Sequence, residues 1–331
     1  MKKLLLTFVL LFSVPTLAGF TEAINYFDNQ QYAQAFSEFK PLADKDDERA
    51  QYYIAYMYLN GFGVVQNTEL GLDYLKRSAE QEYEKSLSLL AYFYSTGKYL
   101  EQDKKKALDL YLKAAEYEDD DALLNLGVIY YTADGVAHDT QKAIDYFQRV
   151  DLVSNPIVGR YLADIYLYQE DDKLRKKAKD LYLLAASNGD MGSFQALAAF
   201  LQQEKNNPKG LEEAITYYTY AASQGYAPSQ YTLGILYANG TGVPKNMMKA
   251  YAWFSLAANQ GLAPAIEAQK ELEDSLTFSE LDYGRGQIIE IQQTVIGKIE
   301  SPLKDFKLKA LQETKKNNRN QNRPSRRRRG R

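Results

Sequence analysis

The sequence predicts an all-α protein built from repeated helix pairs, because small residues recur every 35 or 36 positions along most of the 331-residue chain. They form three tracks. The first is Ala55, Ala91, Gly127, Ala163, Ala198 and Gly234. The second is Ala35, Gly71, Ala107, Ala143, Ala178, Ala214 and Ala250, and the third is Ala43, Ala79, Ala115, Asp151, Ala186, Ala222 and Ala258. Three tracks that share one period and one single-residue deletion indicate a structural repeat.

Residues 227–262 show one repeat most clearly. Apolar residues at helical spacing predict a first helix around Leu233, Leu236 and Tyr237, and a second helix from Ala250 onward. A small residue at one helical position lets two helices approach closely, and the residue three places later lies on the same face. We therefore expect the residues three places after the first track to be core positions: Tyr58, Tyr94, Tyr130, Tyr166, Leu201 and Tyr237.

Loop and cap residues stay in phase with the same repeat. Gly63, Gly135 and Gly242 lie between the two helices of their pairs, where a left-handed backbone favours glycine. Asn or Asp is found four residues before the second-track position in four repeats, and both are strong helix N-caps. These predicted N-caps are Asn67, Asp103, Asp139 and Asn246, and three later glycines, Gly189, Gly225 and Gly261, are expected to end second helices.

These residues resemble the Sel1-like repeat, a relative of the tetratricopeptide repeat. The best unit contains Leu233-Gly234, Gly240 and Gly242-Val243, followed by Lys249-Ala250 and Trp253. The resemblance covers about residues 23–281, although the units at 156–190 and 191–226 lack the loop glycines. It implies a right-handed superhelical solenoid of antiparallel helix pairs. For function it implies a protein-binding scaffold, since the family is defined by its architecture.

The chain is expected to have four parts. These are a signal peptide over 1–18, a repeat solenoid over 19–281, a C-terminal capping helix over 282–300 and a basic, disordered tail over 301–331. A solenoid needs a capping element because its last repeat otherwise exposes an apolar face. Thr277 and Glu280 have the spacing of a capping box before that helix.

Residues 1–18, MKKLLLTFVLLFSVPTLA, have the layout of a secretory signal peptide: two lysines, an apolar run and a small-residue exit. The alternative is an uncut membrane anchor. The chain contains no cysteine, so it has neither a disulfide nor a lipoprotein anchor. We expect an exported protein of the bacterial periplasm.

The tail is strongly basic. Residues 301–331 contain 12 Lys or Arg against 2 Asp or Glu, and Arg326, Arg327, Arg328 and Arg329 form its densest charge. Three partners are considered: anionic lipid or lipopolysaccharide, nucleic acid, and the acidic body of the chain itself or of a partner. Export separates the tail from cellular nucleic acid, which disfavours that partner.

The sequence gives little support for catalysis. It has one histidine, His138, which the repeat places in a loop, and no thiol, so no cofactor, metal site or catalytic residue is predicted. The carboxylate runs at 119–121 and 170–172 fall at helix junctions, where Asp commonly caps a helix. We therefore expect a protein that is not an enzyme.

Tyrosine is abundant, with 28 residues, and three of them are candidates for binding a partner. Tyr52, Tyr56 and Tyr92 lie on first helices away from the repeat track. First helices line the inner surface of such a solenoid, where Tyr56 and Tyr92, one period apart, are expected side by side. Aromatic side chains there suit protein recognition, and the alternative is that they pack between repeats. We expect a scaffold that binds a protein partner, or alternatively a structural or regulatory component of an envelope machine for motility, secretion or polysaccharide export.

Overall fold

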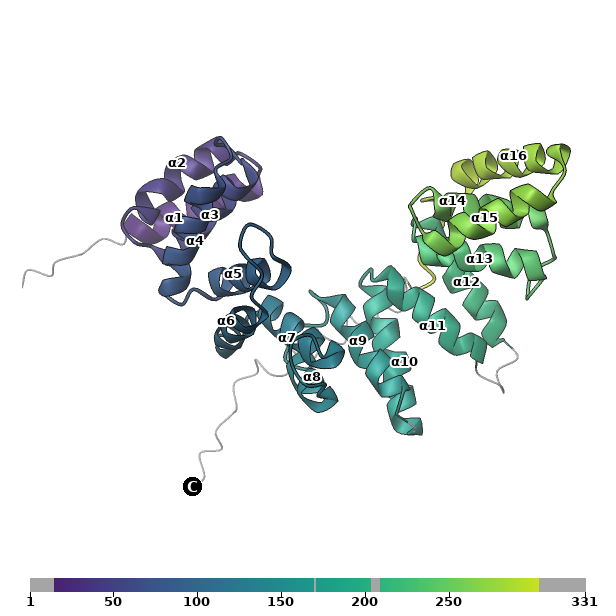
Figure 1. Ribbon diagram of the computed structural model, residues 1–331, viewed down its shortest axis with the longest axis horizontal. Coiled ribbons are helices and arrows are strands. Elements are labelled where there is room, and N and C mark those ends of the chain that lie inside the picture. The colour runs from purple at the N-terminus through teal and green to yellow at the C-terminus, as the bar shows by residue number, and fades with distance from the viewer. Residues whose placement is uncertain (1–14, 170, 204–208, 304–331) are drawn as a thin grey trace, which may run out of the picture. The chain divides into compact units, whose positions relative to one another are not determined.

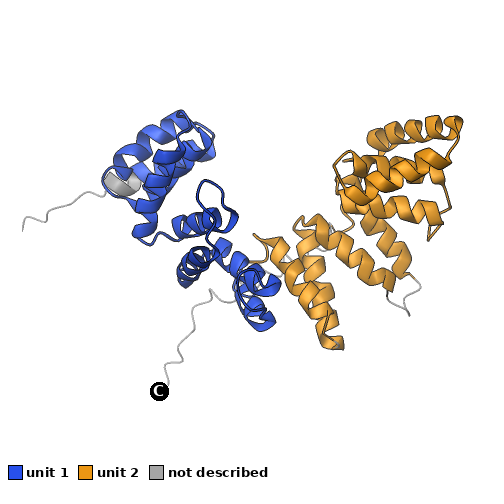
Figure 2. Ribbon diagram, in the orientation of Figure 1, with its two compact units in different colours: residues 1–150 blue, residues 151–331 orange. Residues whose placement is uncertain are grey.

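The computed structural model describes residues 15–169, 171–203 and 209–303. In these residues it contains sixteen α-helices and no strand, which confirms the all-α prediction. The chain divides into two compact units, residues 1–150 and 151–331, which Figure 2 colours separately. None of the described helices combines the length and apolarity that a membrane span requires.

Unit 1 consists of four helix pairs in chain order (Figure 1). Its helices are α1 (Pro15–Asp28), α2 (Tyr32–Ala43), α3 (Glu48–Asn60), α4 (Thr68–Glu80), α5 (Glu84–Thr96), α6 (Lys104–Glu116), α7 (Asp120–Thr132) and α8 (Thr140–Phe147). Within a pair the two helices pack together, and α2, α4 and α6 each pack on the first helix of the next pair. The helix α1 begins inside the segment predicted as a signal peptide.

Unit 2 consists of three further pairs, a last first-helix and a capping helix. Its helices are α9 (Pro156–Leu167), α10 (Asp172–Ser187), α11 (Met191–Gln203), α12 (Gly210–Ser223), α13 (Ala227–Asn239), α14 (Met247–Ala258), α15 (Ala263–Ser275) and α16 (Phe278–Thr294). Both α15 and α16 pack on α14, so the last pair is covered on its open side. Each unit is therefore a solenoid of helix pairs.

The first track of small residues lies at matching seams between paired helices. A Cβ added to Gly127 would come within 2.3 Å of the Phe147 ring, and one added to Gly234 within 2.4 Å of the Phe254 ring. Ala55 lies at the corresponding seam, where its carbonyl oxygen is 3.2 Å from a Cβ added to Gly71. The small residues therefore allow the close helix approach that the period predicted.

The predicted caps are confirmed. The side chains of Asn67, Asp103, Asp139 and Asn246 each accept a hydrogen bond from the backbone N–H three residues later. Gly63 adopts a left-handed φ of 72°, and a Cβ there would lie 2.5 Å from the Tyr32 carbonyl carbon. Glycine at this position therefore allows both the turn and the contact with α2.

The third track breaks at Asp151, and the structure changes there. α8 ends at Phe147 after only 8 residues, and Asp151 instead forms a turn by accepting hydrogen bonds from the Val153 N–H and the Ser154 hydroxyl. The boundary between the two units falls between Val150 and Asp151.

The predicted tyrosine core positions are mostly wrong. Among the five tyrosines on that track, Tyr166 is buried with 4% exposure, but Tyr58, Tyr94, Tyr130 and Tyr237 are only half-buried. A lysine from the second helix lies over four of these rings, for example Lys142 at 4.8 Å from the Tyr130 centroid. The equivalent lysines lie over Tyr94, Tyr166 and Tyr237. Tyr94, Tyr130 and Tyr237 therefore combine partial burial with a cation–π contact.

The C-terminal end of the described chain folds back on unit 2. The capping box of Thr277 and Glu280 forms, so α16 begins at Phe278 and not at 282. After α16, the Gly297 N–H donates to the Ser223 carbonyl at 2.6 Å, and Leu303 is 5% exposed in a cluster with Ala186, Phe194 and Ala221. The folded part therefore reaches at least residue 303, past the predicted tail boundary at 301. The rest of the tail lies outside the described residues.

Candidate protein-binding face

Aromatic side chains from α1, α2, α3 and the adjoining loops of unit 1 form a tight cluster. Phe39 stacks on Tyr53 with ring centroids 4.7 Å apart, and Tyr32 stacks on Phe62 at 4.6 Å. Phe27 lies edge-on against several of these rings, including Tyr56 at 6.1 Å. The members are Phe20, Phe27, Tyr32, Phe39, Tyr52, Tyr53, Tyr56, Phe62 and Tyr83. Packed rings hold one another in fixed orientations, so those at the edge of the cluster form a rigid surface.

Two of the predicted tyrosines belong to this cluster. Tyr52 and Tyr56 are half-buried, and their ring centroids are 6.4 Å apart. Tyr52 also contacts Tyr83, which precedes α5, at 5.6 Å. Burial raises the pKa of Tyr52, and the neighbouring Tyr53 and Tyr56 add to the effect. These two rings therefore pack in the way that the alternative interpretation expected, while their edges remain accessible.

Tyr92, the third predicted tyrosine, is different. It occupies in α5 the position that Tyr56 occupies in α3, but 43% of its surface is exposed. Its ring contact is with Phe93, at 5.9 Å. Tyr56 therefore contacts Phe27 of the preceding pair, whereas the ring contact of Tyr92 lies within its own helix. A large exposed ring on a well-packed helix is available to a ligand without unfolding anything.

Carboxylates lie close to these tyrosines at the start of α7. Asp119 caps α7 by accepting from the Ala122 N–H at 2.9 Å, and it also accepts a short hydrogen bond from the Ser88 hydroxyl of α5. Partial burial raises the pKa of the Asp121 carboxyl, and the charges of Asp119 and Asp120 raise it further. Both Asp119 and Asp121 act electrostatically on the Tyr52 phenol.

These groups define one surface, here named the Tyr92 face, which consists of Tyr52, Tyr56, Tyr83, Tyr92, Asp119 and Asp121. It joins the first-helix sides of α3, α5 and α7, and neighbouring first helices α5 and α7 are in direct contact. The face combines aromatic rings with negative charge. Aromatic rings and carboxylates together can bind a cationic group.

Tyr111 of α6 is buried, with 1% exposure. Its hydroxyl has no hydrogen-bond partner among the described residues. Burial raises the pKa of Tyr111 to about 12, and the Ser95 side chain opposes that rise. The charges of Asp121 and Asp119 also raise the pKa of Tyr111.

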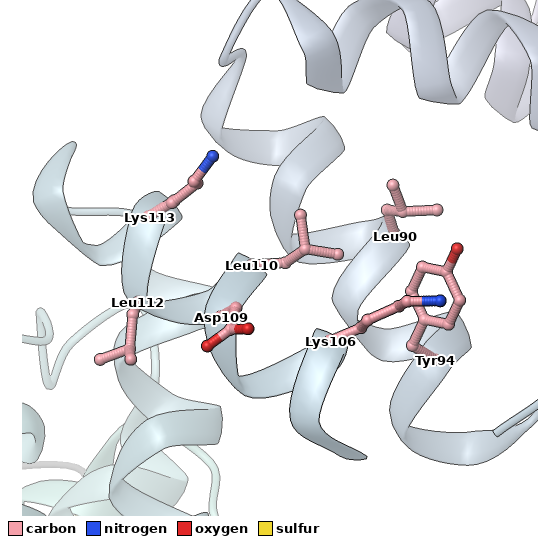
Figure 3. A pocket seen from close by; sticks show the side chains of 7 residues that line it. All are labelled: Leu90, Tyr94, Lys106, Asp109, Leu110, Leu112 and Lys113. Carbon is pink, nitrogen blue, oxygen red and sulfur yellow. The ribbon is translucent and has the colours of Figure 1, made fainter. Parts of the chain in front are cut away.

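A pocket of about 600 Å³ lies between α5 and α6 (Figure 3). It is lined by Leu90, Tyr94, Lys106, Asp109, Leu110, Leu112 and Lys113. The leucines and the Tyr94 ring supply apolar surface, and Lys106 lies over that ring at 5.4 Å. The pocket could accept one apolar side chain of a bound segment, with charged groups at its edge.

The structure also bears on the other residues that the sequence singled out as possible sites. Arg326, Arg327, Arg328 and Arg329 lie outside the described residues. His138 is exposed beside Thr140. Asp119 and Asp171 cap α7 and α10, as the junction positions predicted, and the described residues contain no group of three or more His, Cys, Asp or Glu that could hold a metal ion.

Sequence analysis missed most of the aromatic cluster and the pocket. Phe27 and Tyr53 have no aromatic residue one period later, so the repeat pattern does not identify them. The signal that could have found them is the local density of rings between residues 20 and 62. The pocket has no comparable signal, because its residues come from two helices and repeat only in part.

Comparison with known proteins agrees with this geometry. The Sel1 repeat family model matches residues 48–83, 85–116, 120–149, 160–190, 205–226 and 227–262, more than half of the chain. Among solved structures, the chain is similar to a protective antigen present in uropathogenic Escherichia coli strains displaying an SLR fold, with 24% identity and a TM-score of 0.74. That match covers 90% of this chain and 63% of the antigen, so this chain spans less than two thirds of that protein.

A second similar structure is a Sel1 repeat protein from Oxalobacter formigenes, with 24% identity and a TM-score of 0.64. The match covers 72% of this chain and 96% of that protein. Both structures show the shared fold. The opening pair, α1 and α2, lies before the first matched repeat, although its tracks through Ala35 and Ala43 follow the same period.

Proposed function

Since this chain belongs to the Sel1 repeat family, whose members are generally protein-interaction scaffolds, we propose that it is an exported scaffold of the bacterial periplasm that binds a protein segment on its Tyr92 face. The basic tail, with Arg326–Arg329 as its densest charge, concentrates the protein near anionic envelope components such as acidic lipid or lipopolysaccharide. Family membership supports the scaffold role. The partner, the surface and the compartment are the proposal.

The exposure of Tyr92 is the observation that supports the surface. Tyr92 is 43% exposed, while the equivalent Tyr56 is half-buried in a rigid cluster. A bound segment would cover the exposed ring and gain apolar burial at about 25 cal/mol per Å². The rings beneath are already fixed by packing, so little side-chain entropy would be lost on binding.

Export rests on the first eighteen residues and on composition. Two lysines, an apolar run and a small-residue exit have the layout of a signal peptide, and a chain without cysteine folds independently of the redox state of its compartment. Fusion of residues 1–18 to a reporter that is active only outside the cytoplasm tests this point. A silent reporter would contradict export.

Site-specific photo-crosslinking tests the binding surface. A photoreactive amino acid is placed at Tyr92 in intact cells, and a matched one at Tyr168, which is 82% exposed in unit 2. We expect a discrete protein adduct from position 92 and none from position 168. Adducts from both positions, or from 168 alone, would contradict the Tyr92 face.

The tail is tested by deletion of residues 315–331, followed by envelope fractionation at low and high salt. Attraction of the tail to an anionic surface is screened beyond about 10 Å at 0.1 M salt. We expect the intact chain to leave the envelope fraction as salt rises and the deleted chain to be absent from it throughout. Localisation that is insensitive to both salt and deletion would remove the proposed tail role.

A further inference from the structure

Negative charge in this protein is concentrated in unit 1. Residues 19–150 contain 23 Asp or Glu against 13 Lys or Arg, a net charge of −10, whereas residues 151–300 contain 18 against 13, a net charge of −5. The tail over 301–331 has 12 basic and 2 acidic residues, a net charge of +10. The most basic and the most acidic parts of the chain are therefore nearly equal and opposite in charge.

Part of that negative charge lies on the Tyr92 face. Asp119 and Asp121 lie at the start of α7, and Glu84 begins α5 beside Tyr83. An arginine side chain binds such a surface in two ways, because its planar guanidinium stacks on a ring and pairs with a carboxylate. Unit 1 already contains this arrangement: Arg49 lies 4.3 Å from the Phe20 centroid and pairs with Asp47 at 2.8 Å.

The tail extends well beyond the point where it is attached to unit 2. Leu303, buried against Phe194 and its neighbours, fixes the start of the tail on unit 2. Beyond it are 28 residues, and a chain of that length spans at most roughly 90–100 Å when fully extended. Residues 315–331, KKNNRNQNRPSRRRRGR, contain no apolar side chain other than Pro324, so charge and ring stacking are the contacts they can make.

We propose that residues 315–331 dock on the Tyr92 face of their own chain, with Arg326–Arg329 over Tyr92 and beside Asp119 and Asp121. The regulatory consequence rests on the proposed function. The tail occupies the partner-binding site until it binds an anionic surface instead. The site is then free to bind the protein partner. Binding of the envelope and binding of the partner are thereby linked through one segment.

The absence of cysteine makes a direct test possible in the full-length mature chain. The substitution Ser325→Cys gives a single thiol, to which a benzophenone maleimide is attached. At low salt we expect crosslinks to peptides of α3, α5 and α7, and we expect them to fall steeply with salt. Mixing with an isotopically heavy copy separates crosslinks within one chain from those between chains, and crosslinks only between chains would overturn docking on the same chain.

Two charge variants supply the control. In E84Q/D121N, two carboxylates on or beside the face are removed, and the crosslinks to it should fall by roughly threefold or more. In E69Q/D73N the same charge is removed from α4, where Glu69 also lies in a first turn, and the crosslinks should be unchanged. Equal loss in both variants, or crosslinks spread evenly over the chain, would overturn the proposal.

Vesicles separate this inference from the proposed tail function. Vesicles that contain phosphatidylglycerol should displace the tail and abolish the crosslinks to the Tyr92 face. If crosslinks form but vesicles leave them intact, the docking holds and the proposed contact with anionic lipid fails. If vesicles bind the tail but no crosslink to the face forms without them, the docking is wrong and the proposed tail function holds.

Discussion

Gly127 of α7 and Phe147 of α8 are in such close contact that a Cβ on the glycine would lie 2.3 Å from Cε1 of the ring. Gly234 and Phe254 have the same relationship twenty residues apart, with 2.4 Å for the equivalent distance. Where the first-track residue is Ala55, the residue twenty places later is the smaller Leu75, which is fully buried. Glycine is therefore followed by Phe at this spacing, whereas Ala is followed by Leu75 in one repeat and by Tyr111 in another.

This pairing predicts a rescue. Gly127→Ala should lower the free energy of unfolding by about 1–3 kcal/mol, because the added methyl overpacks the seam. The double variant Gly127→Ala/Phe147→Leu has the same residue types as the Ala55 and Leu75 pair. It should recover part of the lost stability, so the effects of the two substitutions should not be additive. Urea unfolding of the two single variants and the double variant measures it.

Gly286 of α16 provides the control, since nothing lies within 4 Å of a Cβ there. Gly286→Ala should stabilise the protein by about 0.5–1 kcal/mol through helix propensity alone. Additive effects of the Gly127 and Phe147 substitutions would contradict the close packing of this pair.

The buried hydroxyl of Tyr111 predicts a stabilising substitution. Without a hydrogen-bond partner in the described residues, this group loses its hydration on folding, a penalty of about 1–3 kcal/mol. Tyr111→Phe should therefore raise the midpoint of urea unfolding, and the equivalent positions in three other repeats are already Phe39, Phe147 and Phe254.

Tyr182 occupies the position equivalent to Tyr111, but its hydroxyl has a hydrogen-bond partner. It donates to the Asp164 carboxylate at 2.5 Å. Burial raises the pKa of Asp164, and the Tyr182 hydrogen bond and Arg160 oppose that rise. Tyr182→Phe should destabilise the protein by about 1.5–3 kcal/mol at neutral pH, because a charged acceptor loses its donor. Equal effects of the two Tyr→Phe substitutions would show that hydrogen bonding does not distinguish them.

Asp47 predicts a loss of stability in acid. Burial alone would raise the pKa of its carboxyl, but the Arg49 side chain and the Ala50 N–H outweigh it, so the pKa lies below the ordinary 3.8. Its contribution is therefore present above pH 3.8 and lost as pH falls through the lower folded-state pKa. Asp47→Asn keeps a capping side chain, so its unfolding free energy should fall less than that of the wild type between pH 4 and pH 2.

Ionisation of Asp121 should have the opposite effect on stability from ionisation of Asp47. Partial burial, with help from Asp119 and Asp120, raises its pKa above 3.8, so its protonated form favours the folded state. Asp121→Asn should gain stability relative to the wild type as pH rises through the folded-state value. Melting temperatures across this range check both variants, and parallel curves for the two would contradict the assignment.

Leu303 predicts a local effect in unit 2. Leu303→Ala removes a side chain that is 5% exposed and packed on Phe194, and truncations of buried leucine cost about 2–5 kcal/mol. The segment 295–303 should then open, with faster amide exchange at Gly297, whose N–H donates to Ser223. Exchange in α1–α8 should be unchanged, and a uniform loss of protection across both units would contradict a local role.

Much of the fold follows from local pattern. Asn67, Asp103, Asp139 and Asn246 could be assigned as caps because capping depends on residues within one turn. Gly127 and Gly234 could be assigned to seams because their period repeats six times. The candidate site was harder to predict: Tyr92 was identified from its position, but its carboxylate neighbours Asp119 and Asp121 were interpreted only as helix caps, and their approach to it depends on how α5 and α7 pack.

The sequence by itself determined the repeat, its helix boundaries and the small residues at its seams, because these are set by spacing along the chain. Tertiary structure alone decided that Tyr92 is exposed while Tyr56 packs against Phe27, and that Leu303 returns to α11. Exposure and long-range contact depend on which side chains occupy the neighbouring space after folding. The spacing of residues along the chain does not show which side chains will be neighbours in space.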